Sequence, residues 1–178
     1  MSGKRKRKTD PFPIPIKWVP WMLFALSLLL YLNTLRHGFV LDDAIVISEN
    51  KFTQQGIDGW SGILTKDTFF GFFQKEGKDQ LVAGGRYRPL SLLFFSFVYE
   101  IAGNNPTIFH FFNLLFYGIL IVVLYQWLLD VFRKKKYRYW IASLSALIFT
   151  VHPVHTEVVA NIKGMDELLA LLFALLAA

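Results

Sequence analysis

The sequence contains no cysteine and has little charge. With no cysteine among its 178 residues, neither a disulfide framework nor thiol chemistry can be used to infer a compartment or a reaction. Charged residues make up 18% of the chain, whereas 54% are hydrophobic and 17% are aromatic. An ordinary soluble domain carries about 25% charged residues. Because the hydrophobic residues also come in long blocks, the composition predicts an integral membrane protein.

The basic residues are concentrated beside the apolar blocks. Residues 4–8 are five consecutive cations, and alternating prolines follow in residues 11–15. A net charge of +6 and a basic pentad also occur in nuclear and nucleic-acid-binding proteins. Cations within about 15–20 residues of a span, however, are the usual cytoplasmic retention signal. We therefore interpret residues 1–17 as a basic cytoplasmic tail and expect no nucleic-acid partner.

The first apolar block covers about residues 18–35 and approaches the ~20 residues that cross a hydrocarbon core. Trp18 and Trp21 suit the head-group level, and Pro20 lies in the first turn, where its missing N–H costs least. A cleaved signal peptide is the alternative, but no A-x-A-like cleavage site follows the block. We predict an uncleaved anchor that leaves the N-terminus in the cytoplasm and the next loop outside.

Two adjacent carboxylates, Asp42 and Asp43, follow this span after a short turn. A carboxylate is costly in hydrocarbon, so the pair is expected just outside it, hydrated or facing a substrate at the lipid boundary. Residue types alone leave two interpretations open. The pair either ends the span and begins a solvated loop, or it performs chemistry on a lipid head group.

Residues 37–107 form the longest stretch without a span and are poor in Lys and Arg, as expected outside the membrane. Within it, residues 60–73 mix large apolar side chains with polar ones. This pattern predicts a short interfacial helix, and the alternative is the core of a small soluble loop domain. Residues 90–101 also read as a helix. Twelve residues rise only ~18 Å, so we place this helix in the outer interface.

Arg86 and Arg88 lie beside the flexible glycines 84 and 85 in the same loop. A planar guanidinium offers paired donors that match phosphate oxygens, so the two arginines are candidates for a phosphate site. Alternatively, both side chains snorkel from the base of the apolar run that follows.

The second span is predicted over about residues 108–132, and the dense basic loop at 133–138 returns the chain to the cytoplasm. His110, Asn113 and Tyr117 share one face near its outer end. Polar groups there face protein rather than lipid, and we expect Asn113 to make a hydrogen bond between helices.

A third apolar segment, residues 139–151, ends at His152, His155 and Glu157. If it crosses the membrane, these side chains rejoin Asp42 outside, whereas a re-entrant hairpin would leave them in the cytoplasm. Imidazole and carboxylate groups bind several divalent metals. The intervening proline disrupts the helix that would align the two histidines, so the metal signal is weak. The plainer interpretation is a polar helix end followed by a short surface helix.

The final apolar run, residues 168–178, rises roughly 16 Å and is too short to span. We expect residues 18–178 to be the N-terminal part of a larger membrane domain whose fourth span is truncated. No repeat of about 34 residues is present.

Five motifs in this order carry a family resemblance: residues 38–43 (GFVLDD), 86–90 (RYRPL), 110–113 (HFFN), 152–157 (HPVHTE) and 164–169 (GMDELL). They resemble the GT-C membrane glycosyltransferases, specifically the protein O-mannosyltransferase branch and its relatives that join a membrane domain to tetratricopeptide repeats. The resemblance implies an all-α polytopic membrane protein. Its large extracytoplasmic first loop, residues 37–107, carries interfacial helices.

The resemblance also implies a reaction. A mannose-like hexose leaves a polyprenyl-phosphate carrier with inversion and is attacked by a hydroxyl, often that of a protein serine or threonine. Asp42 resembles the leading acid of the family and is the expected general base. Asp43 either orients the acceptor or supports Asp42. Arg86 and Arg88 are the expected ligands of the carrier phosphate, where they would stabilise developing charge.

His152, His155 and Glu157 are expected to line the same cavity. The implied partners are membrane lipid, the lipid-linked sugar donor and a hydroxyl acceptor. No cofactor is firmly implied, and a divalent metal has only weak support. One departure is Met165, where relatives often have an arginine.

We expect a bacterial inner membrane in preference to the endoplasmic reticulum. A non-catalytic scaffold or a transporter is the alternative function. A transporter would be favoured by a pair of broken helices at mid-membrane, and the sequence shows no such pair.

Overall fold

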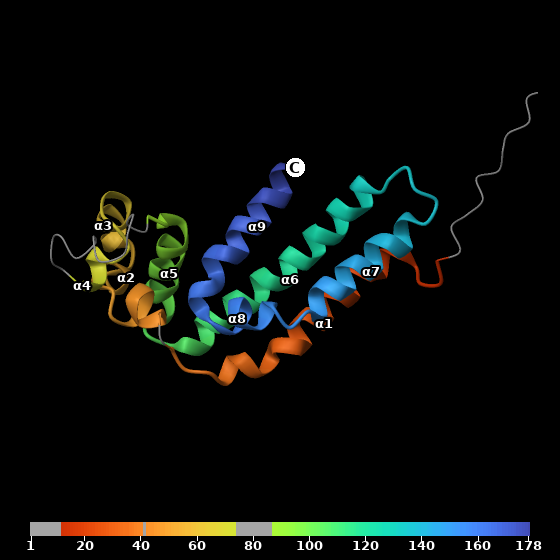
Figure 1. The fold of residues 1–178 in the computed structure, drawn as a ribbon. Coiled ribbons are helices and arrows are strands. Elements are labelled where there is room, and N and C mark those ends of the chain that lie inside the picture. The colour runs from red at the N-terminus through yellow and green to blue at the C-terminus, as the bar shows by residue number, and fades with distance from the viewer. Residues whose placement is uncertain (1–11, 41, 74–86) are drawn as a thin grey trace, which may run out of the picture.

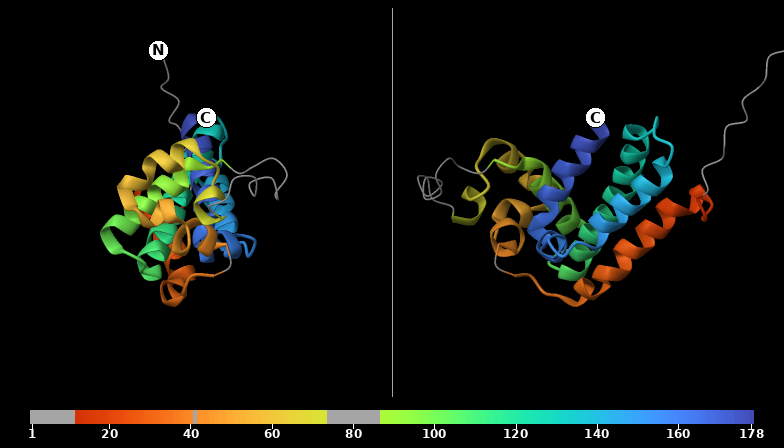
Figure 2. Two further views of the ribbon diagram at one scale, coloured as in Figure 1. Left: turned by 90° about the vertical axis from the view of Figure 1, so that its left-hand side faces the viewer. Right: turned by 45° about the vertical axis from the view of Figure 1, so that its right-hand side comes forward.

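The structure is a computed structural model that describes residues 12–40, 42–73 and 87–178. Every regular element within these ranges is helical, which confirms the all-α prediction for the described part of the chain. Figures 1 and 2 show α1, α6, α7 and α9 side by side, with the shorter helices of residues 44–102 gathered to one side of this bundle.

Two helical segments are long and apolar enough to cross a membrane. The first, Ile16–Arg36, joins a 3-10 turn (Ile16–Trp18), α1 (Val19–Tyr31) and a second 3-10 turn (Leu32–Arg36). The second is α6 (Pro106–Val131), whose 26 residues rise ~39 Å. The side chain of Asn105 caps α6 by accepting from the N–H of Thr107. Both helices lie where apolar block length predicts them.

Helix α6 is the centre of the bundle and packs against α1, α7 (Arg138–Val151) and α9 (Met165–Ala177). Their shared core, here called the bundle core, is built from buried apolar side chains on all four helices. Prominent members are Leu23, Leu114, Tyr117, Ile121, Ala142, Ala146 and Leu172. The small side chains of Ala142 and Ala146, both fully buried, let α7 approach its neighbours closely.

The ring of Phe12, just before α1, lies 5.1 Å from the ring of Trp140 at the start of α7. Helices α1 and α7 therefore run in the same direction, and α6 runs against both (Figure 1). As a result, the end of α1, the start of α6, the end of α7 and the start of α9 meet at one end of the bundle. Residues 152–157 thus lie at the end of the bundle that carries Asp42.

The prediction of a single interfacial helix over residues 60–73 is wrong. The structure has α3 (Trp60–Thr65) and α4 (Phe70–Phe73), separated by a turn. The carboxylate of Asp67 accepts from the N–H of Phe69 at 2.8 Å and so breaks the helix. Phe69 and Ile63 are buried, as the alternative of a loop core requires.

The remaining outer elements are a π-helical turn (Ala44–Ser48), α2 (Lys51–Gln54), a 3-10 turn (Gly56–Gly59) and α5 (Pro89–Ala102). They form a second core with α6 and α9, in which Val46, Ile47, Ile63, Leu92, Phe95, Phe109, Ile162, Met165 and Leu169 are buried. Helix α5 begins one residue before its predicted start and ends at Gly103, whose φ of +59° suits glycine. The outer helices are therefore anchored to the bundle.

Helix α9 begins three residues before the predicted apolar run. Asp166 and Glu167 occupy its first turn, where their charges complement the helix dipole.

Candidate functional site

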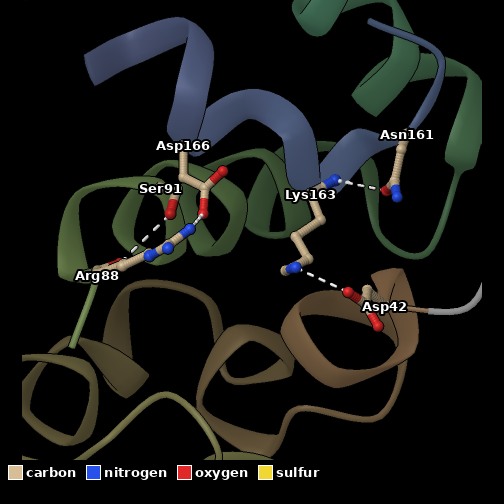
Figure 3. A network of polar contacts seen from close by, with 6 residues as sticks. All are labelled: Asp42, Arg88, Ser91, Asn161, Lys163 and Asp166. Carbon is tan, nitrogen blue, oxygen red and sulfur yellow. Dashed lines mark hydrogen bonds and ion pairs between the residues drawn. The ribbon is translucent and has the colours of Figure 1, made fainter. Parts of the chain in front are cut away.

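Three segments that are far apart in sequence meet beside the outer end of the bundle. They are the start of the π-helical turn, the start of α5, and the turn between α8 (His155–Ala160) and α9. Between them lies a cavity of about 250 Å³, here called the charged cavity. Its charged lining consists of Asp42, Arg88, Lys163 and Asp166 (Figure 3), and apolar side chains such as Val46, Phe69, Leu92 and Phe95 complete it.

Asp42 lies at the rim of this cavity. Its Oδ2 is 2.7 Å from Nζ of Lys163, and its side chain is 47% exposed (Figure 3). The carboxylate is therefore both charge-paired and accessible. A base that must reach an incoming hydroxyl needs this combination.

Asp43 has the opposite environment, because its side chain is fully buried. Oδ1 accepts from the backbone N–H of Lys163 at 2.9 Å, and Oδ2 accepts from the backbone N–H of Val40 at 3.1 Å. Burial raises the pKa of Asp43, although the two N–H groups oppose that rise. Asp43 thus ties the loop after α1 to the turn before α9. This contact suits the role of support for Asp42.

The turn that carries Lys163 is held from several sides. The carboxamide oxygen of Asn161 also accepts from the N–H of Lys163, at 3.2 Å, and caps the 3-10 turn Ile162–Gly164. From α6, Nδ2 of Asn113 donates to the carbonyl of Asn161 at 2.8 Å. The expected hydrogen bond of Asn113 therefore exists, but its acceptor lies in the turn after α8 and not in another helix. A Cβ on Gly164 would lie 2.1 Å from the carbonyl oxygen of Val158, so the close approach requires glycine.

Arg88 immediately precedes α5, and its guanidinium forms an ion pair with the carboxylate of Asp166 in the first turn of α9. Ser91 Oγ donates to the backbone carbonyl of Arg88 at 3.3 Å (Figure 3). The second predicted arginine, Arg86, lies outside the described residues.

Arg88 and Asp166 also line a neighbouring groove of about 420 Å³ between α5 and α9. The groove is otherwise largely apolar, with walls from Pro89, Leu90, Leu169, Ala170 and Phe173. A charged cavity and an apolar groove therefore share one ion pair.

Glu157 and Asp42 line a smaller cavity of about 150 Å³ together with Lys163 and Asp166. His152 and His155 line neither cavity that contains Asp42. The ring of His155 instead lies 4.2 Å from that of Phe149, and its burial lowers its pKa. The structure thus brings Glu157 to Asp42 and separates the two histidines from it.

Among the residues that the structure describes, no group of three or more His, Cys, Asp or Glu side chains could hold a metal ion. His152 and His155 have ring centroids 6.1 Å apart. The second histidine begins α8, as the plainer interpretation of a helix end followed by a short surface helix expects.

Sequence reasoning missed Lys163 and Asp166. Lys163 is 121 residues from Asp42, and Asp166 is 78 residues from Arg88. The available signal was a lysine and an aspartate three residues apart, flanking a glycine at a helix start.

Three known proteins that are similar to this chain are all named protein O-mannosyl-transferases. The chain is 35% identical over 157 residues to human "Protein O-mannosyl-transferase TMTC1", covering 88% of this chain and 17% of that protein. It is 33% identical over 181 residues to mouse "Protein O-mannosyl-transferase TMTC4", covering 94% and 23%. A Caenorhabditis elegans "Protein O-mannosyl-transferase F38B6.6" is 30% identical over 166 residues, covering 88% and 22%.

These matches confirm the resemblance inferred from the motifs, and the chain spans about a fifth of the length of these relatives. No protein-family model and no solved structure matches the chain. The relatives come from animals, so the expectation of a bacterial inner membrane is not supported.

Proposed function

Because the chain is a relative of the TMTC protein O-mannosyl-transferases over most of its own length, we propose that it forms part of a membrane glycosyltransferase. The enzyme moves a mannose-like hexose from a polyprenyl-phosphate carrier to a hydroxyl group, that of a protein serine or threonine. Transfer takes place on the extracytoplasmic side.

The observation that carries the proposal is that the charged cavity and the apolar groove share the ion pair of Arg88 and Asp166 in their linings. A lipid-linked sugar has a long apolar chain, a phosphate and a polar ring in that order. The groove between α5 and α9 suits the chain, and the guanidinium of Arg88 at the junction suits the phosphate. Pockets for drug-sized ligands measure about 300–1,000 Å³, so the 250 Å³ of the charged cavity suits a single sugar ring.

Asp42 acts as the general base in this arrangement. The acceptor oxygen attacks the anomeric carbon while its proton passes to the carboxylate of Asp42. The bond from the anomeric carbon to the phosphate oxygen breaks, and its electron pair stays on the phosphate. Attack from the side opposite the carrier inverts the anomeric centre. Arg88 stabilises the negative charge that develops on the departing phosphate.

The distribution of basic residues supports the sidedness of this proposal. The loop at 133–136 contains four consecutive cations and follows α6 at the end remote from the charged cavity. The start of α1, which the basic residues 4–8 precede in sequence, lies at the same remote end (Figure 1). The charged cavity therefore faces the extracytoplasmic side, with the N-terminus in the cytoplasm.

Transfer can be tested with the full-length protein in lipid vesicles, supplied with a labelled polyprenyl-phosphate mannose and a Ser/Thr-rich peptide. The wild type should label the peptide, and Asp42→Asn should abolish labelling while it preserves expression and membrane insertion. Asp58→Asn removes an exposed carboxylate from the turn Gly56–Gly59 and should keep full activity.

The scaffold and transporter alternatives give a different result. A protein of either kind would transfer no sugar from any polyprenyl donor, and a transporter would move a solute across the vesicle membrane. Full labelling by Asp42→Asn would remove Asp42 as the base.

A further inference from the structure

The residue at position 165, in the first turn of α9, is uncharged. Met165 is fully buried among the apolar side chains of the second core, so it contributes no charge to the charged cavity. Two residues earlier, the ammonium group of Lys163 enters that cavity and meets Asp42 (Figure 3). This chain therefore has a cation beside the proposed base, although it has none at position 165.

We propose that Lys163 is a catalytic residue whose ammonium group changes partner during sugar transfer, from Asp42 in the resting site to the phosphate of the carrier. The inference rests on the proposed function and assigns a role to a residue outside the family motifs that suggested it. Arg88 cannot make the same exchange, because its partner Asp166 is not the proposed base and keeps its charge during transfer.

Charge balance during the reaction drives the exchange. The lipid-linked sugar is a phosphate diester with one negative charge, and the product is a monoester that carries about two near neutral pH. As the phosphate gains charge, Asp42 accepts the hydroxyl proton and becomes neutral. Lys163 thus loses its attraction to Asp42 in the same step in which the phosphate begins to attract it. An interaction that strengthens only in the transition state accelerates the reaction.

The geometry permits this movement without loss of structure. The backbone of Lys163 is held by Asp43 and Asn161, whereas its side chain makes its ion pair with Asp42 alone among the described contacts. The side chains of Lys163 and Asp42 are 24% and 47% exposed. Ion pairs with that access to water are weak, so a phosphate with three strong acceptor oxygens competes effectively.

The charges around the cavity are otherwise balanced. Within the part of the chain that the structure describes, its lining contains two cations, Lys163 and Arg88, and two carboxylates, Asp42 and Asp166, in two pairs. Neutralising Asp42 therefore leaves one cation unpaired. A phosphate monoester should bind more tightly to that state than to the resting one.

Binding of farnesyl monophosphate to the detergent-solubilised full-length protein tests this directly by calorimetry, with uncharged farnesol as the comparison ligand. Asp42→Asn mimics the protonated base and should bind the monophosphate about tenfold more tightly than wild type, with no change for farnesol. Lys163→Met should bind it about tenfold more weakly. Lys163→Arg should keep wild-type binding, and Asp58→Asn is the matched control for loss of a remote carboxylate.

The double variant Asp42→Asn/Lys163→Met distinguishes release of Lys163 from a non-specific effect of removing one negative charge. If Lys163 is the group set free, the double variant binds as weakly as Lys163→Met. The exchange is overturned if Asp42→Asn fails to tighten binding, or if it tightens binding equally without Lys163.

Sugar transfer by the same proteins separates the two proposals. The binding pattern without any transfer by wild type would overturn the proposed function and leave only the coupling of Lys163 between Asp42 and a bound phosphate. If wild type transfers sugar but the variants do not show the expected changes in binding, only the proposed exchange by Lys163 is contradicted.

Discussion

The bundle core and the charged cavity are built largely from different helices, and they treat polar groups in opposite ways. In the bundle core, Tyr117 is fully buried and its hydroxyl donates to the carbonyl of Thr150 at 2.9 Å. In the charged cavity, Asp42 and Arg88 keep exposed side chains and pair through charge. Buried hydrogen bonds fix a structure, whereas exposed ion pairs contribute little to it and can be exchanged.

The boundary between the two kinds of region passes between two consecutive residues. Asp43 is buried and bound to backbone N–H groups, as a structural residue is, whereas Asp42 faces the cavity. Substitutions should therefore separate stability from activity according to the region that they affect.

The largest loss of stability should come from Asp43→Ala. It leaves the N–H of Val40 without its carboxylate acceptor and removes the bond between Asp43 and the N–H of Lys163. Each lost hydrogen bond costs about 0.5–1.5 kcal/mol, so we expect a loss of about 1–3 kcal/mol. The measurement is urea unfolding in detergent, followed by tryptophan fluorescence. Asp43→Asn keeps one acceptor and should lose less. Equal losses in the two variants would contradict this account of Asp43.

Within the bundle core, Tyr117→Phe should destabilise the protein by about 1 kcal/mol, the usual net value of one buried hydrogen bond. Sugar transfer per folded molecule should stay at the wild-type level, because the hydroxyl does not line the charged cavity. The same unfolding experiment, with a transfer assay on the folded fraction, checks both statements. A large loss of specific activity would show that the two regions are coupled.

Arg88→Gln should have the opposite effects, with little change in stability and a large change in activity. Its side chain is 49% exposed, and exposed ion pairs contribute less than about 1 kcal/mol to stability, so unfolding should change little. The KM for the lipid-linked donor should rise about tenfold or more, because the phosphate loses its guanidinium. Initial rates at varied donor concentration measure this effect. A variant that unfolds readily but keeps a normal KM would place Arg88 among the structural residues.

The smallest effect concerns pH and His155. Burial lowers its pKa below the ordinary value of 6.5, so the folded state binds fewer protons than the unfolded state. Stability therefore rises with pH in this range and is lost as the pH falls through 6.5. His155→Phe keeps a ring against Phe149 and should show a smaller drop in Tm between about pH 7.5 and 5.5. His152, whose ring lies near that of His155, stays in both proteins. An identical drop would contradict the assignment.

The positions of the long helices could be predicted because they depend on local features. Apolar block length and flanking charge locate α6 within about two residues, and the same criteria locate Ile16–Arg36. The break between α3 and α4 could not be predicted in this way. It depends on the side chain of Asp67 and on the burial of Phe69 in a core built by distant segments.

For the site, the sequence identified side chains but not their partners. Asp42 and Arg88 were found through motifs, and both line the charged cavity. Lys163 was not found, because its contact with Asp42 spans 121 residues and the local pattern of a lysine and an aspartate around Gly164 does not indicate that contact. His155 was expected in the cavity because a third span would bring residues 152–157 to the side of the membrane that carries Asp42. The first turn of α8 points the two side chains to different neighbours.

The central claim is that Asp42 is the base and Asp43 its structural support, and one comparison tests it most directly. Sugar transfer per folded molecule is measured for Asp42→Asn and Asp43→Asn in the full-length protein, with the folded fraction of each determined by unfolding. We predict that Asp42→Asn folds like wild type and transfers no sugar, whereas Asp43→Asn is destabilised and its folded molecules retain measurable transfer. Retained transfer by Asp42→Asn, with complete loss in folded Asp43→Asn, would contradict the account.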